Sequence, residues 1–189
     1  MAGMILIICY LLGSIPTAYI AGRWFSGKDI RQMGDLNSGA ANVYREVGAR
    51  VGIVVGIVDA AKGALVIVIS RMAGFSEIMV LISGLAAMAG HNWPLFLRFR
   101  GGRGVSTSIG ILLLTYTQPT LIVAAPCLIV LILTRSVNKA MAVFYIPLTT
   151  LGWWLGLPGL AIGYSLLLPL IVGLTHYARI RKPRARLST

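Results

Sequence analysis

The sequence predicts an all-α integral membrane protein in which seven helices cross the bilayer, folded as a single membrane-integral domain over residues 1–189. Hydrophobic residues make up 57% of the 189 positions, and the mean hydropathy of +0.84 exceeds that of soluble domains. Several apolar runs approach the length of about 20 residues that a bilayer crossing needs, and basic residues lie in alternate gaps between them. Helices follow because backbone exposed to lipid has to satisfy its own hydrogen bonds.

Seven apolar runs define the predicted helices in chain order. They cover residues 4–22, 51–70, 77–90, 105–117, 120–134, 140–156 and 159–175. The first run has no basic flank before it and is followed by further apolar runs, so we interpret it as a membrane helix and not as a signal peptide. The third, fourth and seventh runs are short or rich in glycine, which is compatible with tilted or partial spans.

The distribution of basic residues predicts the orientation. Of the 17 Lys and Arg residues, 15 fall in alternate loops or in the C-terminal tail, and the exceptions are Lys62, inside a span, and Arg71. Basic residues favour the cytoplasmic side of a membrane. The N-terminus is therefore predicted to face outward, and the C-terminus and any active site are predicted to face the cytoplasm. This alternation requires an odd number of spans.

Composition also limits the expected partners. The net charge of +12 is compatible with nucleic-acid binding, but the bias of membrane proteins toward basic cytoplasmic loops explains it, so no nucleic-acid partner is expected. Cys9 and Cys127 lie inside apolar runs and suggest neither a disulfide nor a metal site. With two histidines and no Cys-x-x-Cys pattern, no metal and no cofactor are expected. We expect a monomer surrounded by membrane lipids.

The predicted cytoplasmic loop MGDLNSGAANVYREVG (33–48) has the composition of a ligand-binding loop. Its small residues let the backbone approach a ligand closely. Asn37 and Asn42 offer amides, and Arg45 offers a planar fork that suits phosphate. Asn42 and Arg45 share one face of a helix, because they are three residues apart. An ordinary polar loop is the alternative for this segment.

The stretch HNWPLFLRFRGGRGVST (91–107) predicts a phosphate cradle. Its glycines allow successive N–H groups to point into one concavity, and a helix that begins near Val105 adds partial positive charge. The candidate ligands here are Gly101, Gly102, Arg103, Gly104, Ser106 and Thr107. The spacing of a Walker A loop is absent. The alternative is a plain basic loop of a membrane protein.

Four further ionisable residues are candidates for chemistry. His91 and His176 lie at the predicted cytoplasmic ends of two helices, where histidine suits proton transfer near neutral pH. A structural hydrogen bond is the alternative for each. Asp59 and Lys62 lie one turn apart inside a span, where ionisable residues are costly and suggest a function. A structural ion pair that holds this helix to its neighbours is the alternative.

Together these segments resemble a known family, the bacterial membrane-embedded acyl-phosphate:glycerol-3-phosphate acyltransferases of the PlsY type. GSIPTAYIAGR (13–23) with DIR (29–31) resembles the N-terminal segment of the family, and NSGAANVYREVG (37–48) resembles its first loop motif. DAAKG (59–63) resembles its D-x-x-K-G. GHNWPLFLRFRGGRGVST (90–107) is similar to G-H-x-F-P-x-F-L-x-F-K-G-G-K-G-V-A-T almost position for position.

The resemblance implies a seven-helix bundle with its active site at the cytoplasmic face. It implies transfer of a fatty acyl group from acyl phosphate to the 1-hydroxyl of glycerol 3-phosphate, which gives lysophosphatidic acid and phosphate for phospholipid biosynthesis. By match, Arg103 and its glycines bind phosphate, Asn42 and Arg45 hold the polar substrate, and His91 lies in the second loop motif. A covalent acyl-enzyme is not implied, because a mixed anhydride is already reactive and positioning with charge neutralisation supplies the acceleration.

Three positions in the substrate loops depart from the family pattern. Asp35 and Asn138 each stand where the family has a serine, and Arg179 stands where it has an asparagine. A carboxylate beside a dianionic acceptor is unfavourable, so Asp35 predicts an altered choice of substrate. One hypothesis pairs Asp35 with Arg179 across the site. Another makes Asp35 a general base for an acceptor that is less anionic than glycerol 3-phosphate.

Three functions stay open at this point. The first is an acyltransferase that uses acyl phosphate, the second is a divergent or non-catalytic paralogue with a changed acceptor, and the third is a small anion or lipid transporter. The candidate catalytic residues are His91, Asp35 and His176. The candidate substrate-binding residues are Asn37, Asn42, Arg45, Lys62, Gly101, Gly102, Arg103, Gly104, Ser106, Thr107, Asn138 and Arg179.

Overall fold

The computed structural model describes residues 2–180, and the regular structure in this part of the chain is entirely helical. The elements in order are α1 (Ala2–Gly13), α2 (Thr17–Ser26), the 3₁₀ helix η1 (Ile30–Gln32), α3 (Ala40–Glu46), α4 (Ala49–Met72), α5 (Glu77–Asn92), the 3₁₀ helix η2 (Leu95–Leu97), α6 (Val105–Thr115), α7 (Thr117–Thr134), α8 (Val137–Trp154) and α9 (Gly159–Ile180). The predicted all-α class is confirmed, and each of the seven predicted intervals contains a helix.

Five segments within residues 2–180 are long and apolar enough to cross a membrane. They are Ala2–Ser26, Ala49–Met72, Glu77–Leu97, Thr117–Thr134 and Gly159–Ala178. Helix α6 is shorter, since its 11 residues rise only about 16 Å, whereas the hydrocarbon core is about 30 Å thick. At least one end of α6 therefore lies inside the bundle and not at a membrane surface.

The first predicted helix, over residues 4–22, is wrong as a continuous element. It divides into α1 and α2, with Ser14–Ile15–Pro16 between them. Pro16 lacks an N–H donor and disfavours helical backbone at the residue before it, which explains the break at this position. The break leaves the carbonyl oxygen of Ile15 outside any helix, where it accepts a hydrogen bond from the Lys62 ammonium at 3.0 Å.

Helices α4 and α6 pack against each other at the centre of the bundle through small residues. A Cβ on Gly63 of α4 would meet the carbonyl oxygen of Thr107, and a Cβ on Gly110 of α6 would meet that of Ala60. Such contacts let two helix backbones approach closely, as is common inside membranes. The main apolar core is formed by buried side chains from several helices between α4 and α9, which include Ile67, Met88, Ile111, Phe144 and Leu168.

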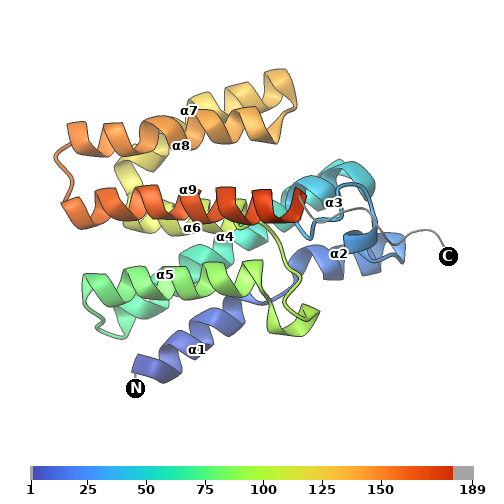
Figure 1. The fold of residues 1–189 in the computed structure, drawn as a ribbon, viewed down its shortest axis with the longest axis horizontal. Helices are drawn as coiled ribbons and strands as arrows, with labels where there is room; N and C mark the ends of the chain where they lie inside the picture. Colours follow the sequence, from blue (N-terminus) through green and yellow to red (C-terminus); the bar gives the residue numbers. More distant parts are fainter. Residues whose placement is uncertain (1, 181–189) are drawn as a thin grey trace.

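The connections divide between the two ends of the bundle (Figure 1). The segment with η1 and α3, the η2 loop, the α7–α8 turn and the C-terminal end of α9 lie at the right-hand end of the view. The start of α1 and the other connections between long helices lie at the opposite end. The loops that the sequence marks as basic are therefore gathered at one end, which is where the candidate site lies.

Candidate functional site

The loop before α3 is shaped by the side chain of one buried residue, Asn42. Its amide nitrogen donates to the carbonyl oxygens of Ile30 (3.1 Å), Met33 (2.9 Å) and Asn37 (3.0 Å). Its amide oxygen accepts from the backbone N–H of Asp35 at 3.3 Å. These contacts occupy the donors and the acceptor of the amide, so Asn42 acts on the site by fixing the loop. Direct substrate binding by Asn42 stays a prediction.

The loop places Asp35 between two arginines from different parts of the chain. The Oδ2 atom of Asp35 lies 3.0 Å from a terminal nitrogen of Arg45 and 3.3 Å from a terminal nitrogen of Arg103. Arg45 comes from α3, and Arg103 lies two residues before α6. The structure thus joins three of the predicted site residues through one carboxylate oxygen. We call this group the arginine–aspartate cluster.

The C-terminal part of α9 brings His176 to the same cluster. The hydroxyl of Thr175 donates to the carbonyl oxygen of Arg103 at 3.3 Å, which ties α9 to the loop. The charges of Arg103 and Asp35 both act on the neighbouring His176 ring, which is partly exposed. The proposed pairing of Asp35 with Arg179 stays a prediction, because the side chain of Arg179 lies outside the described residues.

The glycines of the predicted phosphate cradle are used differently from expectation. The N–H of Gly101 donates to the carbonyl oxygen of Asn92 at 3.2 Å, and the N–H of Gly102 donates to that of His91 at 3.0 Å. The prediction that these two N–H groups point into a shared concavity is therefore wrong. Glycine is needed at position 102 because its backbone packs closely against its neighbours. A Cβ there would meet the His91 ring and the carbonyl oxygen of Ser38.

The donors that the backbone leaves available lie at the start of α6. Gly104 adopts a left-handed conformation with φ +85 and places the first turn of α6 directly after Arg103. The first N–H groups of a helix have no acceptor inside it and carry partial positive charge. Within the described residues, the buried Thr107 hydroxyl and the buried Nε of Arg103 have no hydrogen-bond partner. Ser106, also in this turn, is partly exposed.

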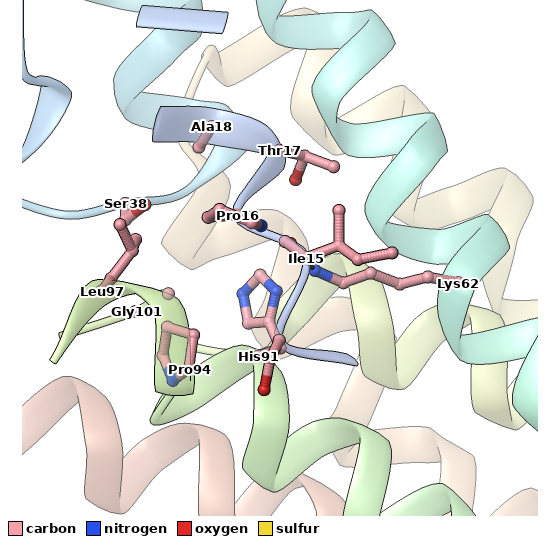
Figure 2. Close-up of a pocket in the computed structure, with 12 residues that line it drawn as sticks. Ile15, Pro16, Thr17, Ala18, Ser38, Lys62, His91, Pro94, Leu97 and Gly101 are labelled. Atoms are coloured by element: carbon pink, nitrogen blue, oxygen red, sulfur yellow. Dashed lines mark hydrogen bonds between the residues drawn. The ribbon is translucent and has the colours of Figure 1, made fainter. Parts of the chain in front are cut away.

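A second polar cluster lies deeper, around Asp59 of α4. Its Oδ1 atom accepts from the Thr17 hydroxyl at 2.5 Å, lies 2.8 Å from the Lys62 ammonium and lies 3.6 Å from Nδ1 of His91. The side chains of Asp59 and Lys62 are only 2% and 6% exposed. Figure 2 shows the Lys62 side chain reaching the break between α1 and α2, with the His91 ring beside it. These contacts are those expected of a structural ion pair, and substrate binding by Lys62 stays a prediction.

A small cavity lies beside this deeper cluster (Figure 2). Its walls are formed by Ser14, Ile15, Pro16, Thr17, Ala18, Ser38, Lys62, His91, Pro94, Leu97, Gly101 and Gly102. Its volume of about 10 Å³ is close to the space that one water molecule needs. The His91 ring lies against the backbone of Gly102, the residue before Arg103, and its predicted catalytic role stays a prediction.

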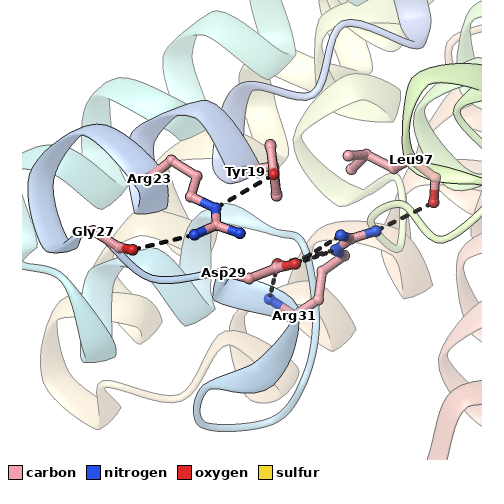
Figure 3. Close-up of polar contacts among 6 residues, drawn as sticks. All are labelled: Tyr19, Arg23, Gly27, Asp29, Arg31 and Leu97. Carbon is pink, nitrogen blue, oxygen red and sulfur yellow. Dashed lines mark hydrogen bonds and ion pairs between the residues drawn. The ribbon is translucent and has the colours of Figure 1, made fainter.

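An ion pair that the sequence interpretation missed supports the same loops (Figure 3). Arg31 donates to both carboxylate oxygens of Asp29, at 2.7 Å for the shortest contact, and also to the carbonyl oxygen of Leu97 at 3.2 Å. Its guanidinium lies over the Tyr19 ring, 5.1 Å from the centroid. The hydrogen bonds from Arg31 lower the pKa of the Asp29 carboxyl below its usual range. The adjacent Asp-Ile-Arg in the sequence was the available signal.

Two predicted residues remain, Asn37 in the loop that holds Asp35 and Asn138 at the start of α8. Asn37 is buried, and its carbonyl oxygen serves the loop as an acceptor for Asn42. Asn138 is exposed in the first turn of α8, at the same end of the bundle. The structure therefore brings together Asp35, Arg45, Arg103 and His176, and it buries Lys62 and His91 around Asp59.

Comparison with known proteins agrees with this architecture. The family model described as glycerol-3-phosphate acyltransferase matches residues 3–186. The chain belongs to the glycerol-3-phosphate acyltransferase family. As a member of it, the protein is an acyltransferase of the membrane-integral type.

Individual relatives match over nearly the whole chain. Glycerol-3-phosphate acyltransferase 4 of Dehalococcoides mccartyi (strain ATCC BAA-2266) is 48% identical over 96% of this chain and 98% of the relative. The glycerol-3-phosphate acyltransferase of Synechococcus sp. (strain CC9902) is 35% identical over 95% and 90%. Among solved structures, the glycerol 3-phosphate form of PlsY, an integral membrane glycerol 3-phosphate acyltransferase, has a TM-score of 0.84 at 27% identity, over 95% of this chain and 90% of PlsY.

Proposed function

We propose that this protein transfers a fatty acyl group from acyl phosphate to the 1-hydroxyl of glycerol 3-phosphate, which yields lysophosphatidic acid and inorganic phosphate. The observation that carries the proposal is the convergence of Arg45 and Arg103 on a single anionic oxygen at the end of the bundle. Two guanidinium groups that meet in this way suit a phosphate group. The solved forms of PlsY with glycerol 3-phosphate and with lysophosphatidic acid support this choice of ligands.

The chemistry that we propose needs no covalent enzyme intermediate. The hydroxyl oxygen of the acceptor attacks the acyl carbon, the bond from that carbon to the phosphate oxygen breaks, and phosphate leaves with the electron pair. Arg103 and the start of α6 neutralise charge on the leaving phosphate, and Arg45, together with a terminal nitrogen of Arg103, holds the phosphate group of the acceptor. His176, beside the arginine–aspartate cluster, suits proton transfer near neutral pH. We therefore propose that it accepts the proton of the attacking hydroxyl.

The buried residues around Asp59 support the loops of the site. The Asp59–Lys62 pair fixes the break between α1 and α2, and His91 lies between Asp59 and the backbone of Gly102. We therefore propose that these residues position the loop without contacting substrate. An ionisable pair inside a span, together with 22 glycines, favoured a transporter, and the contacts of Asp59 and Lys62 with Thr17, His91 and the Ile15 carbonyl oxygen favour a structural role for the pair instead.

We propose seven membrane segments, of which α6 crosses only part of the bilayer, with the N-terminus outside and the arginine–aspartate cluster facing the cytoplasm. The gathering of basic loops at one end of the bundle supports this orientation (Figure 1). The short helix α6 supports a recessed site, which a water-soluble acceptor reaches from the cytoplasm and a lipid-like acyl donor reaches from the bilayer. We further propose that the protein acts as a monomer in the plasma membrane.

The test is acyl transfer by the purified full-length protein in lipid nanodiscs. Palmitoyl phosphate and glycerol 3-phosphate should give equal amounts of phosphate and lysophosphatidic acid, and each substrate alone should give neither. Arg103→Gln should lose at least 100-fold in kcat/KM, which is the usual effect of removing a charge-stabilising donor. Arg100→Gln is the matched control, because Arg100 is an exposed arginine of the same loop.

Three outcomes would contradict the proposal. Acylation from an acyl thioester but not from acyl phosphate would refute the donor. Binding of both substrates without turnover would support the divergent, non-catalytic paralogue that Asp35, Asn138 and Arg179 suggest. Flux of phosphate or lipid into sealed vesicles, without product formation, would support a transporter.

A further inference from the structure

Asp35 already occupies the place where a substrate phosphate would be bound. Its Oδ2 atom accepts hydrogen bonds from Arg45 and Arg103 at 3.0 and 3.3 Å. A phosphate oxygen between the same two guanidinium groups would take the same position, because arginine binds carboxylate and phosphate with one geometry. A bound phosphate group and the Asp35 carboxylate therefore compete for the same donors.

The backbone holds Asp35 in this position by a constrained turn. Gly34 before it and Leu36 after it both have left-handed conformations, with φ +53 and +58. A leucine rarely adopts this conformation, so the turn persists only because its surroundings impose it. The surroundings include the buried amide of Asn42, which accepts the Asp35 N–H. The contact between Asp35 and the arginines is thus built into the loop.

The carboxylate does not use all the binding capacity of the cluster. The buried Nε of Arg103 has no hydrogen-bond partner within the described residues, and the same holds for the buried hydroxyl of Thr107 in the next turn. A carboxylate presents two oxygens, whereas a phosphate monoester presents three and reaches more of these donors at once. A phosphate group therefore has an advantage over Asp35 once it enters, and Asp35 is the weaker of two alternative ligands.

We propose that Asp35 is an internal competitor of the substrate phosphate: its carboxylate occupies the Arg45–Arg103 pair in the unliganded protein and is displaced when the acceptor binds. The inference rests on the proposed function, since it concerns the phosphate group of that acceptor. When only a fraction of the protein is ready to bind, the apparent dissociation constant rises by the inverse of that fraction. Asp35 therefore weakens acceptor binding and shortens the residence of phosphorylated product.

The test is equilibrium binding of radiolabelled glycerol 3-phosphate to the purified full-length protein, without any acyl donor. Asp35→Asn and Asp35→Ser remove the competing charge and should each lower the Kd at least tenfold. Asp35 is a surface residue, with a side chain 33% exposed, and thermal melting would show that both variants fold. Glu46→Gln is the matched control: it removes an exposed acid of the same region, near Gly34, without touching the arginine pair. Its Kd should change less than twofold.

Each alternative result is decisive. An unchanged or higher Kd in both Asp35 variants would overturn the inference, since it would show that Asp35 organises the arginines and does not compete with phosphate. An equal gain in Glu46→Gln would also overturn it, because net charge alone would then explain the effect. If either of these results is found while the wild-type protein transfers acyl groups normally, the inference about Asp35 fails and the proposed function stands. If no protein binds glycerol 3-phosphate and none transfers acyl groups, the proposed function fails as well.

Discussion

Replacing Lys62 with methionine is expected to destabilise the protein by about 3–5 kcal/mol, the usual cost of removing one partner of a buried ion pair. The Lys62 ammonium lies 2.8 Å from Asp59, and both side chains are at most 6% exposed. Methionine has nearly the same volume, so the change removes a charge without opening a cavity. It leaves a buried carboxylate that keeps the Thr17 hydroxyl and the His91 ring, and it leaves the Ile15 carbonyl oxygen with the Thr17 N–H as its remaining donor.

Thermal unfolding in detergent measures this loss directly. Cys9 and Cys127 are free and buried, so a thiol-reactive dye reports unfolding as they become exposed. For a chain of this length, 1 kcal/mol lowers Tm by about 2–4 °C, and the expected decrease is about 6–20 °C. Lys139→Met is the control, because Lys139 is exposed in the first turn of α8 and its loss should change stability by less than about 0.5 kcal/mol.

The double variant Asp59→Asn with Lys62→Met separates a charge effect from a packing effect. It removes both charges and keeps a side chain that can bind Thr17 and His91, so it should recover at least half of the lost Tm. A Lys62→Met variant as stable as the wild type would refute the reasoning. A double variant as unstable as the single one would refute it too, because the cost would then come from packing.

Further predictions concern the loops around the site. Arg45→Lys should raise the KM for glycerol 3-phosphate at least tenfold while the protein stays folded, since lysine lacks the planar fork; steady-state kinetics test this. Gly102→Ala should lower both Tm and activity, because its Cβ would collide with the imidazole beneath it, whereas Gly163→Ala, with open space around it, should cost nothing. The lowered pKa of Asp29 means that its ion pair stabilises the protein above about pH 3.9 and that this stabilisation disappears as the pH falls through the lowered pKa. Tm measured against pH should therefore fall more steeply in acid for the wild type than for Asp29→Asn.

The positions of the long helices could be predicted because apolar run length alone determines them. The same pattern hid the break at Pro16, since the residues on both sides of it are equally apolar. The proline itself was the signal for the break. Helix α3 was not among the seven predicted spans because its 7 residues are too few to cross a bilayer, although the sequence did place Asn42 and Arg45 on one helix face; the buried amide of Asn42 and the buried Val43 hold it in place.

The site was predicted in its residue types but only partly in its geometry. Glycines in the 101–104 stretch indicated a permissive backbone, yet residue type says nothing about where an N–H points, and the N–H groups of Gly101 and Gly102 turned out to serve other carbonyl groups. The meeting of Asp35 with Arg45 and Arg103 joins residues 10 and 68 positions apart. Such a contact arises from tertiary packing and leaves no local trace in the sequence.

The break between the first two helices also limits how this protein can be redesigned. A straight, uninterrupted helix at Ser14–Pro16 would bond the Ile15 carbonyl oxygen within itself and leave the Lys62 ammonium without that acceptor. Conversely, an apolar residue at position 62 would remove the ammonium that binds the Ile15 carbonyl oxygen, and the interruption of the helix would then cost stability. A chimaera that takes one of these segments from a relative should therefore take the other from the same relative, because each is stable only in the presence of the other.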